Sequence, residues 1–222
     1  MKYPDIIGGR TDLPQMSFEK SYLDRAYFLQ AATKYFNDRW GLREFDPSGI
    51  TLPRYRPGFG WGVLMPPAKA QITAQKIFEK LGERFRVWKY SRNSLDDLLD
   101  PTKEARQPGK TGHVVWCQAA NEADECHKKK SANKIAQEGI NVMGLAERLL
   151  LEDFIIYQGW AEHLDVVNAT LCAGSRFRDG HVPRVRWYGS CSEVSVNGYD
   201  PDRANDRLRS RQVVSADARA AA

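Results

Sequence analysis

Two short segments near the end of the chain alternate apolar and polar residues with a period of two. In RVRWY (184–188) and EVSVNGY (193–199), valine or tryptophan alternates with arginine, serine, asparagine or tyrosine. Successive side chains of a β-strand point to opposite faces, so each segment is predicted to be a strand with one buried face and one outward face. The predicted inward side chains are Val185, Trp187, Val194 and Val196.

The outward positions of this region avoid lysine. No lysine follows Lys134, whereas arginine remains frequent. Lysine is rarely buried, so an ordinary solvated face is expected to contain it. Between Arg176 and Arg211 the outward positions use residue types that arise when both adenines of an AAC or AAT codon are randomised, a change that never yields Lys, Glu, Gln, Met or Trp. Trp187 is an inward residue, and Glu193 is an exception that the sequence leaves open between framework and variable position.

Fixed segments surround these positions. They are GHVVWCQAANEADE (112–125), GLAERLLLEDF (144–154), LDVVNATLCAGSR (164–176), DG and VP (179–183), Trp187, PD and A (201–204), and LRSR with VVS (208–215). Together they resemble the variable proteins of diversity-generating retroelements, over roughly residues 60 to 215. In that family a reverse transcriptase copies a template repeat with errors at adenines and writes the product into the 3′ end of the target gene, so that a ligand-binding surface varies. The family itself resembles C-type lectins and formylglycine-generating enzymes.

The order of predicted elements favours an α+β fold, because helices come early and short strands come late. Strands are predicted over 60–66, 85–90 and 113–118, helices over 68–81 and 142–157, and a loop over 97–112. The resemblance implies a C-type-lectin-like domain with two or three helices and a mainly antiparallel C-terminal sheet. We expect an N-terminal helical arm and linker over 1–57, this domain over 58–216 with a variable region at about 176–211, and a disordered tail over 217–222.

An amphipathic helix is predicted from Ser17, placed as an N-cap, to Trp40, with Gly41 just beyond its end. Its apolar stripe is Phe18, Tyr22, Ala26, Leu29, Thr33, Phe36 and Trp40. Such an aromatic stripe must be covered by other apolar surface. Packing within the chain is favoured, and a homodimer formed through this helix is the alternative.

The outward residues of the variable region are the predicted ligand-binding surface. Tyrosine and arginine supply large contact areas and serine and asparagine supply adaptable hydrogen bonds, as in antibody paratopes. The predicted contacts are Phe177, Arg178, His181, Arg184, Arg186, Tyr188, Ser190, Cys191, Ser195, Asn197, Tyr199, Arg203, Asn205 and Asp206. The ligand is expected to be a protein or another macromolecule. A solvated sheet face without a ligand is the alternative interpretation.

Arg176, Arg209 and Arg211 belong to the framework, where bonds to carbonyl groups or to Asp179 and Asp202 would tie loops together. The alternative is contact with RNA or single-stranded nucleic acid, since arginine interleaved with tryptophan and tyrosine can neutralise phosphates and stack on bases. This alternative is the main rival function.

Composition bounds the remaining possibilities. The chain has 222 residues, 42% of them hydrophobic, a net charge of +5 and no long apolar run, which is typical of a soluble globular protein. The N-terminus has no apolar stretch of signal-peptide length, so cytoplasmic residence is expected. The four cysteines are expected to be free thiols, and the histidine and cysteine spacing fits no zinc pattern, so no metal or cofactor is expected. No nucleophile and base arrangement or phosphate-binding loop is evident, which indicates a protein that is not an enzyme.

Overall fold

The structure, a computed structural model, describes residues 25–43, 45–54 and 56–216, and these have a mixed α+β architecture. The described α-helices are α2 (Arg25–Trp40), α3 (Ala74–Gly82), α4 (Leu95–Leu98), α5 (Ala132–Gln137) and α6 (Leu145–Gln158). Three short 3-10 helices are η1 (Ala68–Ala70), η2 (Pro101–Lys103) and η3 (Glu125–His127). The strands are β1 (Trp61–Met65), β2 (Arg86–Lys89), β3 (His113–Cys117), β4 (Ala169–Leu171), β5 (Val182–Tyr188), β6 (Glu193–Tyr199), β7 (Leu208–Arg209) and β8 (Val213–Ser215). None of the described helices is long and apolar enough to cross a bilayer.

These strands form two sheets. The smaller sheet has the order β1-β3-β8, and both of its pairings are antiparallel. The larger sheet has the order β2-β6-β5-β4-β7. Its two central pairings are antiparallel, whereas β2 with β6 and β4 with β7 are parallel. The expectation of a mainly antiparallel sheet is therefore corrected to a mixed sheet, because β2 and β7 join from distant parts of the chain and no local pattern specifies their direction.

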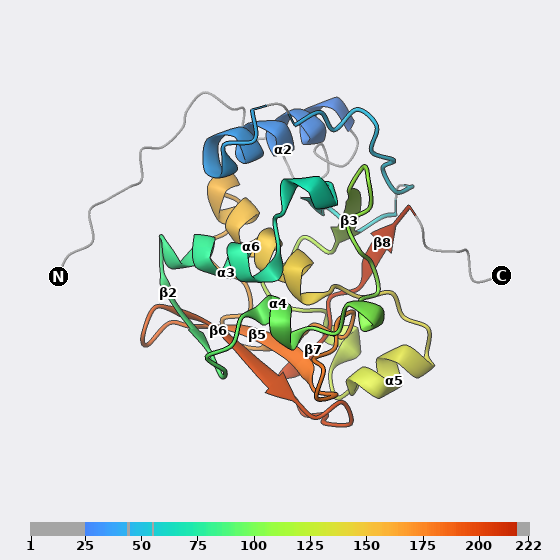
Figure 1. Ribbon diagram of the computed structural model, residues 1–222. Coiled ribbons are helices and arrows are strands. Elements are labelled where there is room, and N and C mark those ends of the chain that lie inside the picture. The colour runs from blue at the N-terminus through green and yellow to red at the C-terminus, as the bar shows by residue number, and fades with distance from the viewer. Residues whose placement is uncertain (1–24, 44, 55, 217–222) are drawn as a thin grey trace.

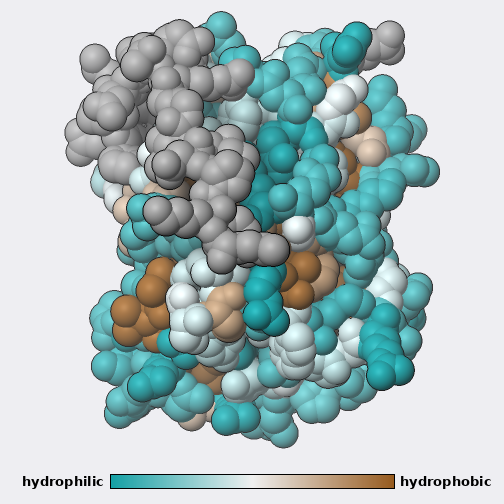
Figure 2. Space-filling model, turned by 90° about the vertical axis from the view of Figure 1, so that its left-hand side faces the viewer, coloured by the Kyte–Doolittle hydropathy of each residue, from teal (hydrophilic) through white to brown (hydrophobic). Residues whose placement is uncertain are grey.

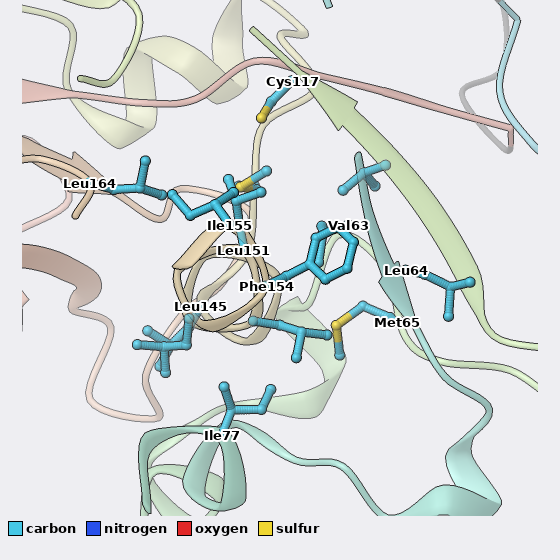
Figure 3. Packing of buried hydrophobic residues seen from close by; sticks show 14 of the residues in the cluster. Val63, Leu64, Met65, Ile77, Cys117, Leu145, Leu151, Phe154, Ile155 and Leu164 are labelled. Atoms are coloured by element: carbon cyan, nitrogen blue, oxygen red, sulfur yellow. The ribbon is translucent and has the colours of Figure 1, made fainter. Parts of the chain in front are cut away.

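Helix α6 runs between α2 and the five-stranded sheet, which forms the lower layer in Figure 1. Almost every residue of α6 from Leu145 to Ile155 is buried. Figure 3 views the helix end-on, with Phe154 directed toward β1 and with Ile77 of α3 and Leu164 on other sides. Because α6 is buried on nearly all sides, it lies at the centre of the core. The strongly apolar run that predicts a helix over 142–157 is thus explained by its central position.

Four charged residues of α6 are also buried, namely Glu147, Arg148, Glu152 and Asp153. Arg148 lies 2.7 Å from Glu152 and 2.8 Å from Asp165, which precedes β4. Asp153 accepts a hydrogen bond of 2.7 Å from the Tyr35 hydroxyl of α2. A buried ion left without its partner costs several kcal/mol, so these pairs fix the position of α6 against its neighbours.

The apolar face of α2 packs within the chain, as favoured from the sequence. Phe28, Ala32, Tyr35 and Phe36 belong to the main core, and the Phe28 ring centre lies 4.8 Å from that of Trp116. The predicted start at Ser17 lies outside the described residues.

The buried stripe of α2 differs by about one residue from the predicted one. Ala26 is exposed and Leu29 and Thr33 are only half-buried. The correction has a simple cause: the large rings of Phe28 and Tyr35, one helical position or two away, take the direction toward the core.

The strands predicted over 60–66, 85–90 and 113–118 and the helix over 142–157 are confirmed by β1, β2, β3 and α6. The helix predicted over 68–81 is divided, because Gln71 has a left-handed φ of 53° and α3 begins anew after the Thr73 N-cap. The helices α4 and α5 are absent from the sequence prediction. Their lengths of 4 and 6 residues leave too few turns for a periodic pattern. The described part of 58–216 thus holds four α-helices, α3 to α6, where two or three were expected.

Candidate ligand-binding surface

The hairpin of β5 and β6 separates two kinds of side chain onto two faces. The inward set of Val185, Trp187, Val194 and Val196 is at most 8% exposed and belongs to the main core, which confirms the prediction. The opposite face of the sheet, which we call the outer face, carries Arg184, Arg186, Tyr188, Ser195, Asn197 and Tyr199. In the strand register Arg184 lies opposite Asn197, and Arg186 lies opposite Ser195. Polar side chains from the two strands therefore stand next to each other.

Arginine and tyrosine side chains alternate along the outer face. The Arg184 guanidinium lies 5.2 Å from the ring centre of Tyr199 and 5.8 Å from that of Tyr188, and its Nη2 donates to the Tyr188 hydroxyl at 3.1 Å. Arg203 lies 4.3 Å from the ring centre of Tyr199, and Arg186 lies 4.9 Å from that of Tyr188. We call these five residues the arginine–tyrosine ladder. A cation–π contact stabilises by about 0.5–1 kcal/mol at an exposed site and by about 2 kcal/mol when it is desolvated.

Two positions expected to be exposed are covered by their neighbours. Arg184 is 5% exposed because it lies between the two tyrosines of the ladder. Ser195 is 3% exposed because its short side chain lies between Arg186 of β5 and Trp88 of β2 in the strand register. Both residues are corrected from exposed contacts to covered positions of the outer face.

A pocket of about 530 Å³ opens beside the ladder. Six residues predicted from the sequence line it, namely Arg184, Arg186, Tyr188, Tyr199, Asn205 and Asp206. Ala169 of β4 and Leu208 of β7 add apolar surface, and Arg207 adds a further guanidinium. Arg207 is missing from the predicted set, although its residue type and its place between 176 and 211 match the pattern used there. The structure thus brings the hairpin residues within 184–199 and the segment 205–208 that follows them to one concave site.

Phe177 does not belong to this surface. It is 2% exposed, it lies in the main core, and its ring centre lies 5.6 Å from that of Tyr90. The turn that begins at Phe177 closes with a 2.8 Å hydrogen bond from its backbone N–H to the His181 carbonyl. This turn directs the ring inward, so the prediction that Phe177 contacts a ligand is corrected to a core role.

Four other predicted contacts lie at the two ends of the hairpin. Arg178 and His181 precede β5 and are exposed, with Arg178 Nε donating to the Asp97 carbonyl at 2.9 Å. Ser190 and Cys191 lie in the turn between β5 and β6, where Ser190 is exposed and Cys191 is half-buried. These residues flank the outer face and do not line the pocket.

Helix α5 covers the outer face beyond Tyr199. Ala132, Leu171 and Val182 form a second small core cluster, against which Tyr199 packs. Asn133 Nδ2 of α5 donates to Asp202 at 2.7 Å, which ties the helix to the turn after β6. The open part of the outer face therefore runs from Tyr199 toward Tyr188 and Arg186.

Exposed apolar side chains flank this open part. Trp88 is 44% exposed, and Val166 and Val167 are 45% and 64% exposed. Arg186 Nη2 donates to the Val166 carbonyl at 3.2 Å, so the valine pair lies directly beside the ladder. Figure 2 shows small hydrophobic patches in the lower half of the molecule, at the level of the five-stranded sheet. Arginine and aromatic side chains are enriched in protein-binding surfaces relative to the rest of the protein surface.

The framework arginines have the structural role favoured from the sequence. Arg211 is fully buried and donates to the carbonyls of Ala120 and Asn121 at 2.8 and 2.6 Å. Arg176 donates to the carbonyls of Ala173 and Ser175 at 2.9 Å each.

The acidic partners of these arginines differ from those expected. Arg211 pairs with Asp165 at 2.8 Å and Arg209 pairs with Glu125. Asp179 and Asp202 lie instead in exposed turns, where Asp179 pairs with His181 and Asp202 accepts a hydrogen bond from Asn133 of α5.

A second cavity, of about 290 Å³, lies near the N-terminus of α6. Glu104 lines it and accepts a 2.8 Å hydrogen bond from the Ser175 hydroxyl on one carboxyl oxygen. The other oxygen has no hydrogen-bond partner within the described part of the chain. Burial raises the pKa of Glu104 to about 7, with a further rise from Glu147 and an opposing effect from the Ser175 hydrogen bond.

The cysteines are free thiols, with Cys117 and Cys172 buried, Cys191 half-buried and Cys126 exposed. Burial raises the pKa of Cys117 to about 12, which keeps this thiol protonated and unreactive. Within residues 25–43, 45–54 and 56–216, no group of three His, Cys, Asp or Glu side chains could hold a metal ion.

Comparison with protein-family models, with curated proteins and with solved structures gave no match. Function is therefore inferred from the geometry and chemistry of the outer face.

Proposed function

We propose that this protein binds a macromolecular ligand through the outer face and performs no chemistry on it. The observation that carries this proposal is the lining of one pocket by six residues of the variable type, four of them on a hairpin whose other face is core. The pocket offers guanidinium groups, aromatic rings and amide groups, which are typical of the energetic centres of binding interfaces. We assign neither a cofactor nor a metal to it.

We further propose that adenine-directed retroelement mutagenesis diversifies this face. Backbone pairing joins β5 and β6 from Val182 opposite Tyr199 to Tyr188 opposite Glu193. These hydrogen bonds do not depend on the outward side chains, and the inward side chains stay in the core. A mutagenic process that changes only the outward positions would therefore leave most of the scaffold intact while it alters recognition.

We also propose a C-type-lectin-like fold for residues 58–216. The support is the combination of two sheets, helices α3 to α6 and a β5–β6 hairpin near the C-terminus that presents the binding face. This fold assignment is more specific than the mixed α+β architecture. It rests on the resemblance of the framework segments to the retroelement variable proteins.

Reading the DNA downstream of the gene tests the diversification proposal. We expect a near-copy of the codons for roughly residues 176 to 211, with differences confined to positions where that copy has adenine. These differences should fall on outward positions such as Arg186, Tyr188 and Asn197 and should spare Val185 and Val196. A downstream region without such a copy, or differences that fall equally on inward codons, would contradict the proposal.

A further inference from the structure

Four arginines around the pocket form no ion pair with any of the described residues. These residues are Arg184, Arg186, Arg203 and Arg207. Among the described residues, none of the four guanidinium groups lies within 4.0 Å of a carboxylate. The nearby acids are paired elsewhere, Asp206 with Lys129 at 3.2 Å and Glu193 with Arg86 at 4.0 Å. Positive charge therefore accumulates on the outer face.

One of these arginines also has an unused donor. The Nε atom of Arg186 is buried and has no hydrogen-bond acceptor within the part of the chain that the structure describes. A buried donor without an acceptor is costly, so the Arg186 side chain is not held in place by a full set of hydrogen bonds. A guanidinium group matches the two oxygens of a carboxylate or a phosphate in a forked geometry. The guanidinium groups of the pocket are therefore suited to bind an oxyanion.

Two observations favour a protein carboxylate over a nucleic-acid phosphate. The rings of Tyr188 and Tyr199 each have two guanidinium groups over them, which leaves less ring surface for a stacked base. The exposed Trp88, Val166 and Val167 beside the ladder offer apolar contacts that a protein surface can cover.

We infer that the ligand of this chain is an acidic segment of another protein, whose Asp or Glu side chains enter the pocket beside the arginine–tyrosine ladder. This inference rests on the proposed binding function and specifies its partner class for this copy of the variable surface. Other copies with different outward residues would bind other chemistry. The net charge of +5 on the chain supports long-range attraction of such a segment.

Fluorescence anisotropy with the full chain tests the inference. The probes are a fluorescein-labelled peptide that alternates Glu and Leu, the same peptide with Gln in place of Glu, and a labelled oligouridylate. The test variant is Arg186→Gln with Arg207→Gln. The matched control, Lys69→Gln with Lys103→Gln, removes the same charge at exposed residues outside the five-stranded sheet.

We expect the Glu peptide to bind the native chain, with affinity about tenfold weaker for the arginine variant and little changed for the lysine control. The Gln peptide should bind far more weakly than the Glu peptide. Arg203→Gln with Arg207→Gln, two exposed residues, serves as a second variant if the first melts early. Equal losses in the arginine and lysine variants, absence of Glu-peptide binding, or tighter binding of oligouridylate would overturn the inference. A downstream template copy found despite such a result would leave the diversification proposal standing.

Discussion

The Trp187 indole and the His163 imidazole lie face to face, with ring centres 3.4 Å apart and ring planes 8° apart. Phe85 packs edge-on against both rings, with its centre 5.6 Å from that of Trp187. Trp187 thereby joins the inner face of β5 to the segment after α6 and to the loop after α3. Its neighbours along the strand, Arg186 and Tyr188, point the other way, toward the pocket.

Trp187→Ala should destabilise the protein by about 3–5 kcal/mol, since it leaves a cavity at a residue that is 8% exposed. Urea unfolding followed by circular dichroism measures this loss. Trp187→Phe is the matched control and should cost less, because a ring remains against His163. A loss below about 1 kcal/mol for the alanine variant would place Trp187 outside the core.

Arg184→Ala should cost more stability than Arg186→Ala. Arg184 is 5% exposed and has two cation–π contacts and a hydrogen bond to Tyr188, so its loss should cost about 1–3 kcal/mol. Arg186 is half-buried, and its replacement should cost less than about 1 kcal/mol. From the sequence, replacing Arg184, Arg186 and Tyr188 together should leave the Tm nearly unchanged, and the structure revises this expectation. Equal losses for the two single variants would argue against the covered position of Arg184.

The sequence predicts the two faces of the β5–β6 hairpin well, because a period of two in side-chain direction needs only the local chain. It does not predict the ladder, since that depends on the register that sets Tyr199 beside Arg184 and on the turn that returns Arg203 over Tyr199. Phe177 shows the same limit. Its residue type matches the variable set, but the turn to His181 directs its ring into the core.

The buried ion pairs are likewise not predictable from a local sequence pattern. The helix from 145 to 158 is predictable from its apolar run, whereas the roles of Arg148, Asp165 and Arg211 depend on contacts between segments far apart in the chain. The same holds for α5, whose six residues cover the outer face only because Leu171 and Val182 lie beneath it.

Asp165→Asn should cost about 3–5 kcal/mol at neutral pH, because it leaves the buried guanidinium groups of Arg148 and Arg211 without their shared carboxylate. Burial alone would raise the pKa of Asp165, but these two arginines lower it overall. A lowered folded-state pKa contributes stability that is present above the unfolded value of about 3.9 and is lost as the pH falls through the folded value.

The free energy of unfolding of the variant should therefore fall less between neutral and acidic pH than that of the native protein. Urea titrations across this pH range would show the difference. Asp97→Asn, at an exposed residue, is the control and should change stability by less than about 0.5 kcal/mol. If Asp165→Asn were as stable as the native protein at neutral pH, this would contradict the stabilising role of the ion pairs of Asp165 with Arg148 and Arg211.

Glu104→Gln should raise the Tm at pH 8 and leave it nearly unchanged at pH 4. The folded-state pKa of Glu104 is about 7, above the unfolded value of about 4.3, so folding favours the protonated carboxyl. The native protein then loses stability as the pH rises from the unfolded value through about 7, and glutamine, which keeps an acceptor for Ser175, avoids this loss. Melting curves across this pH range measure the difference. Glu162→Gln, at an exposed residue, should give no such pH-dependent gain in Tm. A gain equal to that of Glu104→Gln would contradict the raised pKa of Glu104.

The central claim is that the inner face of the hairpin holds the fold while the outer face is free to change. Two randomised libraries test it most directly, one at Arg186, Tyr188, Asn197, Asn205 and Asp206 and one at Val185, Trp187, Val194 and Val196. Protease resistance of displayed variants reports the folded fraction in each library. We predict that most members of the outer library remain folded and that few members of the inner library do. Similar folded fractions in the two libraries would contradict the claim.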